Sequence, residues 1–215
     1  MGINRVFILA ALCAILSLSG CLYQRYSVPV WESFIMDLPE ETYLCPEANT
    51  FSRSNVAVFT FSEPDHAPGT GKVAAEAMFY ALLKDEAFSR IYKETQEEYV
   101  GISNCLDVAR QKGYQLILTG EVLYYFEGSM SLSSTVKERI SVIDVSTRRV
   151  IWSALSSTKA DPAPMKYYYI SSTKGSPARP ASELIEKNAE KFCNMLQRHS
   201  IDQAEIEAEG LTSGS

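Results

Sequence analysis

The chain has 215 residues, which suits one domain with short extensions, because domains commonly run about 100–200 residues. Hydrophobic residues make up 46% of it and charged residues 21%, as in globular proteins with an apolar core. The net charge of −6 disfavours nucleic acid as a partner, since an acidic surface repels phosphate backbones and anionic lipid headgroups.

The first twenty residues have the organisation of a bacterial export signal. Arg5 supplies a positive charge, and the apolar run at 6–16 is shorter than the roughly 20 residues needed to span a hydrocarbon core. The next segment resembles the bacterial lipobox, an aliphatic residue and two small ones before a cysteine: Leu18, Ser19, Gly20 and Cys21. The resemblance implies that signal peptidase recognises Leu18, Ser19 and Gly20, and that the Cys21 thiol is acylated.

Residues 1–20 are therefore interpreted as a lipoprotein signal peptide, with Cys21 as the lipid-bearing N-terminus of the mature protein. Leu22 follows the cysteine. In the enterobacterial sorting pattern that this segment resembles, a residue other than Asp here implies the outer membrane. We expect the chain on the periplasmic face of that membrane. An uncleaved anchor or a conventional signal peptide is the alternative.

Residues 21–54 are predicted to form a lipidated tether and a lead-in to the folded domain. Pro29, Pro39 and Pro46 interrupt any regular element there. The apolar residues at 34–36 are unusual for a free linker. Part of this segment is therefore expected to pack on the domain or on a partner.

The first half of the folded domain, predicted over 55–199, alternates between strand and helix patterns. The opening strand is a short run of apolar β-formers, which is typical of a strand buried on both faces. The first helix has apolar residues at helical spacing, and the second ends before Gly113. The expected elements are a strand at 56–61, a helix at 72–84, a strand at 88–92 and a helix at 103–112.

The second half begins with a long strand at 115–126. Gly120 is expected at a bulge in this strand, and of two neighbouring tyrosines Tyr124 is assigned to the core and Tyr125 to the surface. The residues predicted to share its buried face are Leu116, Leu118, Val122, Tyr124 and Phe126.

Two further strands, at 135–145 and 150–155, are predicted to form a hairpin, and a proline-containing loop follows at about 160–181. Apolar residues at helical spacing then predict a last helix: Ile185, Ala189, Phe192 and Leu196. The acidic, Gly/Ser-ended tail at 200–215 is expected to be disordered. The predicted order is β-α-β-α-β-β-β-α. It indicates an α/β or α+β fold with one mixed sheet of about five strands and about three helices packed on it.

Three segments, at 56–61, 114–122 and 143–153, resemble in order and spacing the motifs of a periplasmic lipoprotein domain. The motifs are an opening "VAVLPF"-type strand, a strand ending in Gly-Glu-Val, and a hairpin of the "D-x-x-TGxϕ-x-W" type. The curli-secretion channel subunit and the outer-membrane lipoprotein activators of penicillin-binding proteins share this domain. The resemblance implies a non-enzymatic protein that acts by binding other envelope proteins.

The chain departs from that family in two ways. Arg148 stands where the hairpin pattern usually has Gly, so a left-handed backbone there would carry strain. The channel-forming relatives have two extra membrane-crossing hairpins, whereas the strand pair at 115–157 has no insertion that supplies them at about 9–11 residues per membrane strand. A pore is therefore disfavoured.

Motifs for other chemistry are incomplete. Gly-Thr-Gly-Lys at 69–72 opens a helix, but His66 and Val73 stand where a phosphate loop needs Gly and Ser or Thr, which leaves anion contact at the helix start or a plain loop. The chain has two histidines, His66 and His199, and no G-x-S-x-G elbow. His66 with Glu63 and Asp65 is interpreted as a solvated loop rather than a loose metal site, and we expect no cofactor or metal.

Three cysteines remain in the mature chain besides Cys21: Cys45, Cys105 and Cys193. They are too far apart in sequence for a typical zinc site. Two of them are free to pair in an oxidising compartment, and the sequence does not choose which. The odd one out is expected to be a buried thiol.

The segment Tyr167-Tyr168-Tyr169 within the proline-containing loop is the candidate partner-contact site, because tyrosine is enriched at interfaces. The alternative is an edge strand or loop that covers the sheet. These observations predict a lipid-anchored, non-enzymatic accessory, scaffold or activator of a cell-envelope complex, with no nucleic acid or small-molecule substrate. A self-assembling ring or secretion component is the second hypothesis, and an envelope hydrolase using His66 or His199 is the third.

Overall fold

The computed structural model describes residues 33–44, 51–95, 98–167 and 172–212. At its centre is a mixed seven-stranded sheet with strand order β1-β7-β6-β5-β3-β4, and β2 also pairs with β7. The strands of this sheet are β1 (Phe34–Asp37), β2 (Glu41–Leu44), β3 (Asn55–Phe59), β4 (Arg90–Glu94), β5 (Leu116–Phe126), β6 (Ser134–Asp144) and β7 (Val150–Asp161). The remaining elements are the helices α2 (Thr70–Asp85), α3 (Ile102–Lys112) and α4 (Ala181–Thr212), and a separate pair of strands, β8 (Lys166–Tyr167) and β9 (Ser172–Thr173).

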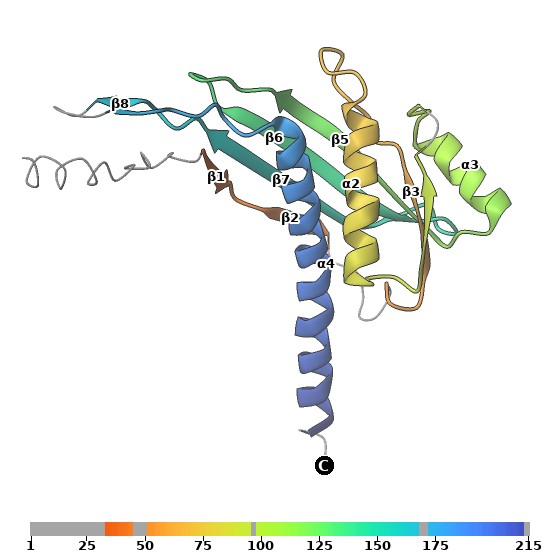
Figure 1. Cartoon of the computed structure of the whole chain (residues 1–215). Helices are drawn as coiled ribbons and strands as arrows, with labels where there is room; N and C mark the ends of the chain where they lie inside the picture. The colour runs from red at the N-terminus through yellow and green to blue at the C-terminus, as the bar shows by residue number, and fades with distance from the viewer. Residues whose placement is uncertain (1–32, 45–50, 96–97, 168–171, 213–215) are drawn as a thin grey trace, which may run out of the picture.

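The sheet has a parallel half and an antiparallel half. β3 pairs in parallel with both β4 and β5, and α2 and α3 form the crossovers that parallel pairing requires. β5, β6 and β7 form an antiparallel meander. Helices α2 and α4 lie side by side on one face, and α3 packs on the other face at the parallel end (Figure 1). The predicted α/β class and the order of elements from β3 to α4 are confirmed.

The core has one layer on each side of the sheet. Under α2 and α4, the indole of Trp152 meets the ring of Phe192 edge-on, with centroids 6.4 Å apart. Under α3, Ile117 packs with Leu106 in a smaller cluster. β3 contributes to both layers, because its alternate side chains point to opposite faces, so the prediction of a strand buried on both sides is confirmed.

Two strands come from the predicted lead-in and raise the count from about five to seven. β1 and β2 pair antiparallel with β7, with Phe34 opposite Asp161 and Glu41 opposite Leu155. The expectation that part of the lead-in packs on the domain is therefore confirmed. Each strand has only four residues, too few for periodicity to show, and the long edge of β7 stabilises them.

The bulge in β5 lies three residues later than predicted, at Leu123, and this reverses the two tyrosines. The register against β6 shifts between Val122 and Tyr124, not at Gly120. Because one extra residue inverts the alternation of faces, Tyr124 is exposed while Tyr125 packs against the core. Gly120 is needed for another reason: a Cβ there would lie 2.9 Å from the ring of Phe61.

Arg148 occupies the left-handed conformation that the hairpin motif predicts for glycine, with φ of 58°. We expect Arg148→Gly to raise the free energy of unfolding by about 0.5–1 kcal/mol, because the left-handed penalty for a side chain outweighs the entropy cost of glycine. Urea unfolding measures this change in free energy, provided that the slope of the free energy against urea concentration (the m-value) stays the same. Arg149→Gly is the matched control, and it should destabilise. Equal losses for both variants would contradict the backbone assignment.

Helix α4 is longer than predicted. It continues to Thr212, so helix occupies positions 200–212, which were predicted to belong to a disordered tail after a domain ending at 199. The acidic composition there suggested disorder, yet Ala, Glu and Gln are also good helix formers. Among the described residues, no helix has the length and apolarity needed to cross a membrane.

Candidate functional site

The residues on which the anchoring prediction rests lie outside the described part of the chain: Leu18, Ser19, Gly20 and Cys21. Lipidation therefore stays a prediction. Tyr168 and Tyr169 also lie outside it, and Tyr167 can be placed. Its strand β8 pairs with β9 in a hairpin separate from the main sheet, and 80% of Tyr167 is exposed. Partner contact through Tyr167, Tyr168 and Tyr169 therefore stays a prediction.

The start of helix α2 is occupied by the protein's own carboxylate. Glu63 accepts hydrogen bonds from the backbone N–H groups of Gly69 and Gly71, at 2.9 and 2.8 Å. A Cβ on Gly71 would lie 2.2 Å from the carbonyl oxygen of Phe61, so only glycine fits. A helix start attracts anions, and here an internal carboxylate meets that demand. The anion contact considered from the sequence is thus made within the chain.

The side chains of His66 and Glu63, considered as loose metal ligands, do not point to a common site. The imidazole Nε2 of His66 lies 3.0 Å from the carbonyl oxygen of Tyr125, while the Glu63 carboxylate faces the helix start. Within the described residues, no three His, Cys, Asp or Glu side chains lie together as a metal site would need. His199 lies on α4, far along the chain from this loop.

Two of the three cysteines are buried thiols on opposite faces of the sheet. Cys105 packs under α3 and Cys193 in the larger core cluster under α4, so these two do not pair with each other. Burial raises the pKa of Cys193 to about 12, which keeps its thiol protonated and unreactive. Cys45 lies outside the described residues.

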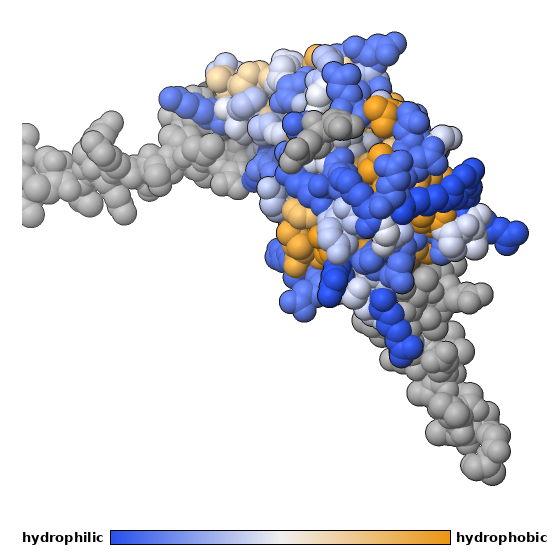
Figure 2. Space-filling view, turned by 90° about the vertical axis from the view of Figure 1, so that its right-hand side faces the viewer, coloured by the Kyte–Doolittle hydropathy of each residue, from blue (hydrophilic) through white to orange (hydrophobic). Residues whose placement is uncertain are grey.

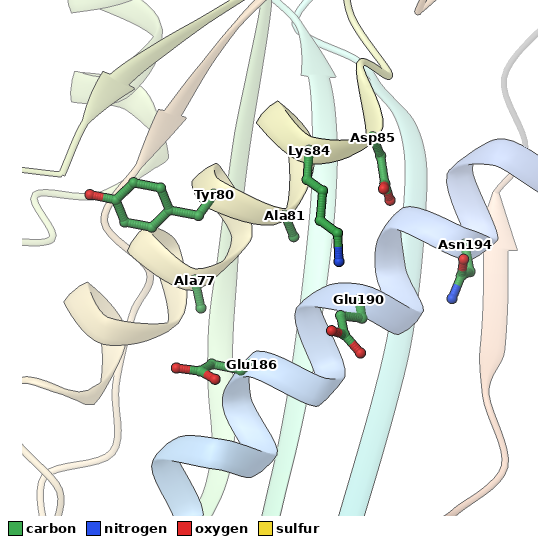
Figure 3. A pocket seen from close by; sticks show the side chains of 8 residues that line it. All are labelled: Ala77, Tyr80, Ala81, Lys84, Asp85, Glu186, Glu190 and Asn194. Atoms are coloured by element: carbon green, nitrogen blue, oxygen red, sulfur yellow. The ribbon is translucent and has the colours of Figure 1, made fainter.

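A hollow of about 450 Å³ separates helices α2 and α4 on the outer side (Figure 3). Its lining combines small, acidic and amide side chains with one lysine: Ala77, Tyr80, Ala81, Lys84, Asp85, Glu186, Glu190 and Asn194. Lys84 reaches from α2 toward α4, where Glu186 and Glu190 supply carboxylates (Figure 3). We call these eight residues the α2–α4 groove. Its alanines allow close approach, and its acidic wall suits a polar or basic side chain of a partner.

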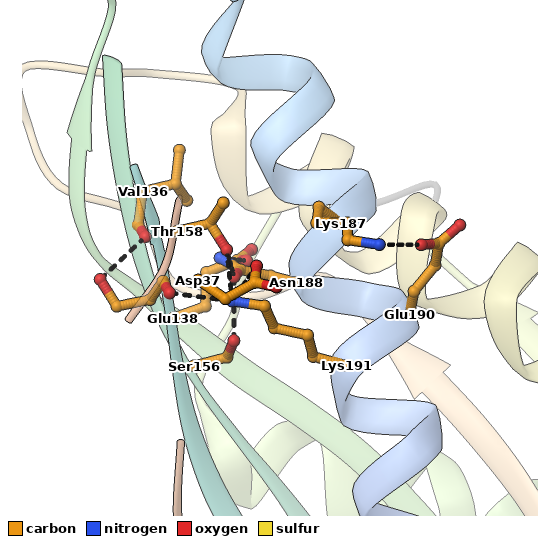
Figure 4. A network of polar contacts seen from close by, with 10 residues as sticks. Asp37, Val136, Glu138, Ser156, Thr158, Lys187, Asn188, Glu190 and Lys191 are labelled. Atoms are coloured by element: carbon orange, nitrogen blue, oxygen red, sulfur yellow. Dashed lines mark hydrogen bonds and ion pairs between the residues drawn. The ribbon is translucent and has the colours of Figure 1, made fainter. Parts of the chain in front are cut away.

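A network of polar side chains lies beneath α4, where the sequence predicted only an apolar core (Figure 4). Asn188 donates to the carboxyl of Glu138 at 2.7 Å and accepts from the hydroxyls of Ser156 and Thr158, at 2.9 and 2.6 Å. Lys191 donates to the Thr158 hydroxyl at 2.7 Å. These side chains are buried, and we call them the buried polar cluster.

The cluster also ties the first strand to the last helix. The Lys191 ammonium lies 3.0 Å from the carboxylate of Asp37 in β1 and donates to the carbonyl oxygen of Ser157 at 3.0 Å. A signal for the cluster existed in the sequence. Glu138 falls in the same alternation phase as Val136 and Ile140, which places a carboxyl on the inner face of β6.

Burial raises the pKa of Glu138 to about 8, although the hydrogen bond from Asn188 lowers it. The folded chain therefore keeps a proton that the unfolded chain releases near its ordinary value of 4.5. The resulting stability is fully present below that value and is lost as pH rises through 8. Glu138→Gln imitates the neutral carboxyl, and its amide oxygen still accepts from Asn188.

We expect Glu138→Gln to gain stability relative to the wild type as pH rises from 4.5 to 8, by up to roughly 4 kcal/mol. Urea unfolding across that pH range measures the gain. Glu186→Gln, on the exposed side of α4, is the matched control and should follow the wild-type profile. Parallel profiles for the wild type and Glu138→Gln would show that the carboxyl is ionised in the folded protein.

The sequence matches no known family model and no curated protein. Among solved structures, the fold is similar to that of PelC from Paraburkholderia phytofirmans, which is described as a dodecamer. One PelC structure has a TM-score of 0.53 and 16% identity over 74% of this chain and 98% of PelC. A second has a TM-score of 0.51 and 17% identity over 72% and 95%. At this identity the similarity concerns the fold.

Smaller overlaps occur with two further proteins. The C-terminal domain of LpoB from Salmonella enterica gives a TM-score of 0.40 and 16% identity over 52% of this chain and 87% of that domain. Lipoprotein GNA1162 from Neisseria meningitidis gives 0.36 and 16% over 51% and 84%. The likeness suggested by the three motifs therefore stands as a likeness of fold to PelC, at 16–17% identity.

Proposed function

We propose that this chain is a lipoprotein anchored through Cys21 to the periplasmic face of the outer membrane, where it serves as a non-enzymatic accessory, scaffold or activator of an envelope complex. One observation carries the proposal: Leu18-Ser19-Gly20-Cys21 follows a positively charged start and a short apolar run. Several acyl chains hold a protein firmly, because each buried CH₂ contributes about 0.8 kcal/mol.

The position of β1 supports a short tether. Phe34 comes thirteen residues after Cys21 (34 − 21 = 13) and is already paired in the sheet. Thirteen residues span at most about 45 Å when fully extended. A partner in the same envelope would thus meet the domain at a raised effective concentration, which is how tethering strengthens a weak contact.

The α2–α4 groove is the surface proposed for the partner. It is hollow and acidic, and it lies between two helices that the core holds in place. The domain would act through this surface as a positioned ligand, without any chemical step.

In-cell crosslinking of the full-length chain tests this function. A photo-crosslinking residue at Lys84, in the groove, is compared with one at Arg148, an exposed turn residue elsewhere. We expect mass spectrometry to find one envelope complex with the Lys84 probe only, and its loss when Cys21→Ala is added. Equal capture from both positions, or capture independent of Cys21, would contradict tethered recognition through the groove.

A self-assembling ring is the second candidate function, favoured by the fold similarity to PelC, which is described as a dodecamer. It predicts a particle many times the 23.9 kDa mass of one chain. Mass photometry of the detergent-extracted full-length protein separates the two candidates. A single large homo-oligomer with no other protein present would favour the ring over the accessory.

A further inference from the structure

Five exposed apolar residues belong to segments that lie at one end of the sheet. They belong to three segments, the start of β1, the β5–β6 connection and the β8–β9 hairpin: Phe34, Met130, Leu132, Met165 and Tyr167. Their exposed fractions run from 49% for Met165 to 80% for Tyr167. We call these five residues the anchor-end surface. The segments meet at the left-hand end of the molecule in Figure 1.

Hydrogen bonds fix the β5–β6 connection at this end. In the β5–β6 connection, the backbone of Ser129 donates to Leu132 at 2.8 Å and accepts from Ala178 at 3.0 Å. Ser133 of the same connection donates to Asp161, the residue that pairs with Phe34. The β5–β6 connection is therefore fixed to the end of β7 and to the segment that precedes α4.

The chain's own tether leads to this end. Phe34 is both the first residue of β1 and part of the anchor-end surface, and Cys21 lies thirteen residues before it (34 − 21 = 13). The acylated cysteine must then stay within about 45 Å of this end. The β6–β7 turn lies at the opposite end of the meander, because antiparallel strands alternate their turns between ends.

Two acidic groups at this end are paired with cations, although the chain as a whole is acidic. Asp161 pairs with Lys159 at 2.8 Å, and Glu183 pairs with Arg179 at 3.1 Å. Glu127 accepts the backbone N–H of Ala181 at the start of α4. The repulsion from lipid headgroups that the net charge predicts is thus weakened here.

The end of the domain around α3 and β4, opposite the anchor-end surface, faces the viewer in Figure 2. Hydrophilic residues dominate that view, and hydrophobic ones show as separate patches among them.

We propose that the anchor-end surface docks on the bilayer that holds the Cys21 acyl chains. This inference rests on the anchoring in the proposed function and adds a fixed orientation. Tyr, Phe, Leu and Met are suited to the headgroup boundary, where amphipathic surfaces insert about 5–10 Å. Docked this way, the β6–β7 turn points away from the membrane.

A depth measurement tests the docking on the full-length, lipidated chain in phosphatidylcholine vesicles. An environment-sensitive fluorophore is placed by Leu132→Cys, and in a matched variant by Val150→Cys, both in a Cys45→Ser background. Cys105 and Cys193 are buried and do not compete for the label. Leu132 and Val150 have similar exposure, 56% and 41%, and lie at opposite ends of the meander.

We expect a lipid carrying a shallow nitroxide to quench the label at residue 132 by about half, consistent with a depth of ~5–10 Å, and to leave that at 150 unchanged. Equal quenching at both positions overturns the docking. A blue-shifted but unquenched label at 132 also overturns it and indicates a protein cover, such as a second copy. Intact-mass spectrometry reads Cys21 acylation separately. The same spectrum counts the labels, and quenching in a singly labelled chain without acyl chains would refute only the anchor.

Discussion

Asn188→Ala is expected to lower the free energy of unfolding by about 3–5 kcal/mol, because it removes the centre of the buried polar cluster. The carboxyl of Glu138 and the hydroxyl of Ser156 both lose the partner that the structure gives them. A buried polar group without a partner costs about 1–3 kcal/mol, and the vacated volume adds a cavity cost. Urea unfolding followed by circular dichroism measures the loss.

Asn194→Ala provides the matched control on the same helix. Asn194 is exposed in the α2–α4 groove, so the substitution has the same helix-propensity gain and no buried partner to lose. Its effect should stay within about 0.5 kcal/mol. Ser156→Ala combined with Asn188→Ala should cost less than the sum of the two single variants, because they share one hydrogen bond. Additive losses of stability would show that the two side chains do not interact.

Cys21→Ala is expected to abolish maturation completely. The thiol is the acyl acceptor that the lipobox resemblance assigns, and Ala has no nucleophile to replace it. Intact-mass spectrometry of the membrane fraction measures the result. The wild type should lack residues 1–20 and carry acyl chains, while the variant should keep residues 1–20 and carry none.

Cys13→Ala is the control for a cysteine effect in the same segment. Cys13 lies inside the apolar run, and Ala preserves its apolar character, so processing should match that of the wild type. If Cys21→Ala still matures with the wild-type mass gain, another residue is the acceptor. The tether would then have a different length, and thirteen residues would no longer hold the anchor-end surface near the bilayer.

The two proposals together give the domain a direction in the envelope. The anchor-end surface would face the membrane, while the α2–α4 groove runs along the helical face of the sheet. The buried polar cluster supports both features. Lys191 holds β1, the strand nearest the tether, to α4, which forms one wall of the groove. Weakening the cluster is therefore expected to loosen both.

The candidate site was predictable only in part. Tyr167, the described residue of the predicted contact segment, is exposed, and its role in partner contact stays a prediction. The groove was not predictable, because its residues come from two helices more than a hundred positions apart in sequence. The sequence pattern did contain Glu138 on an inward-facing position, but periodicity does not reveal which partner satisfies a buried carboxyl. That partner, Asn188, is fifty residues away.

What the sequence by itself determined is local. Apolar periodicity placed β3, α2, α3, β5 and the β6–β7 hairpin, because a strand or helix must bury one face whatever its neighbours are. The hairpin motif likewise predicted the left-handed backbone at Arg148. Only the tertiary structure decided where β1 and β2 pair, where β5 bulges and how Asn188 meets Glu138. Those features depend on a free sheet edge, a register and a buried partner, and each of these exists only once distant segments are packed together.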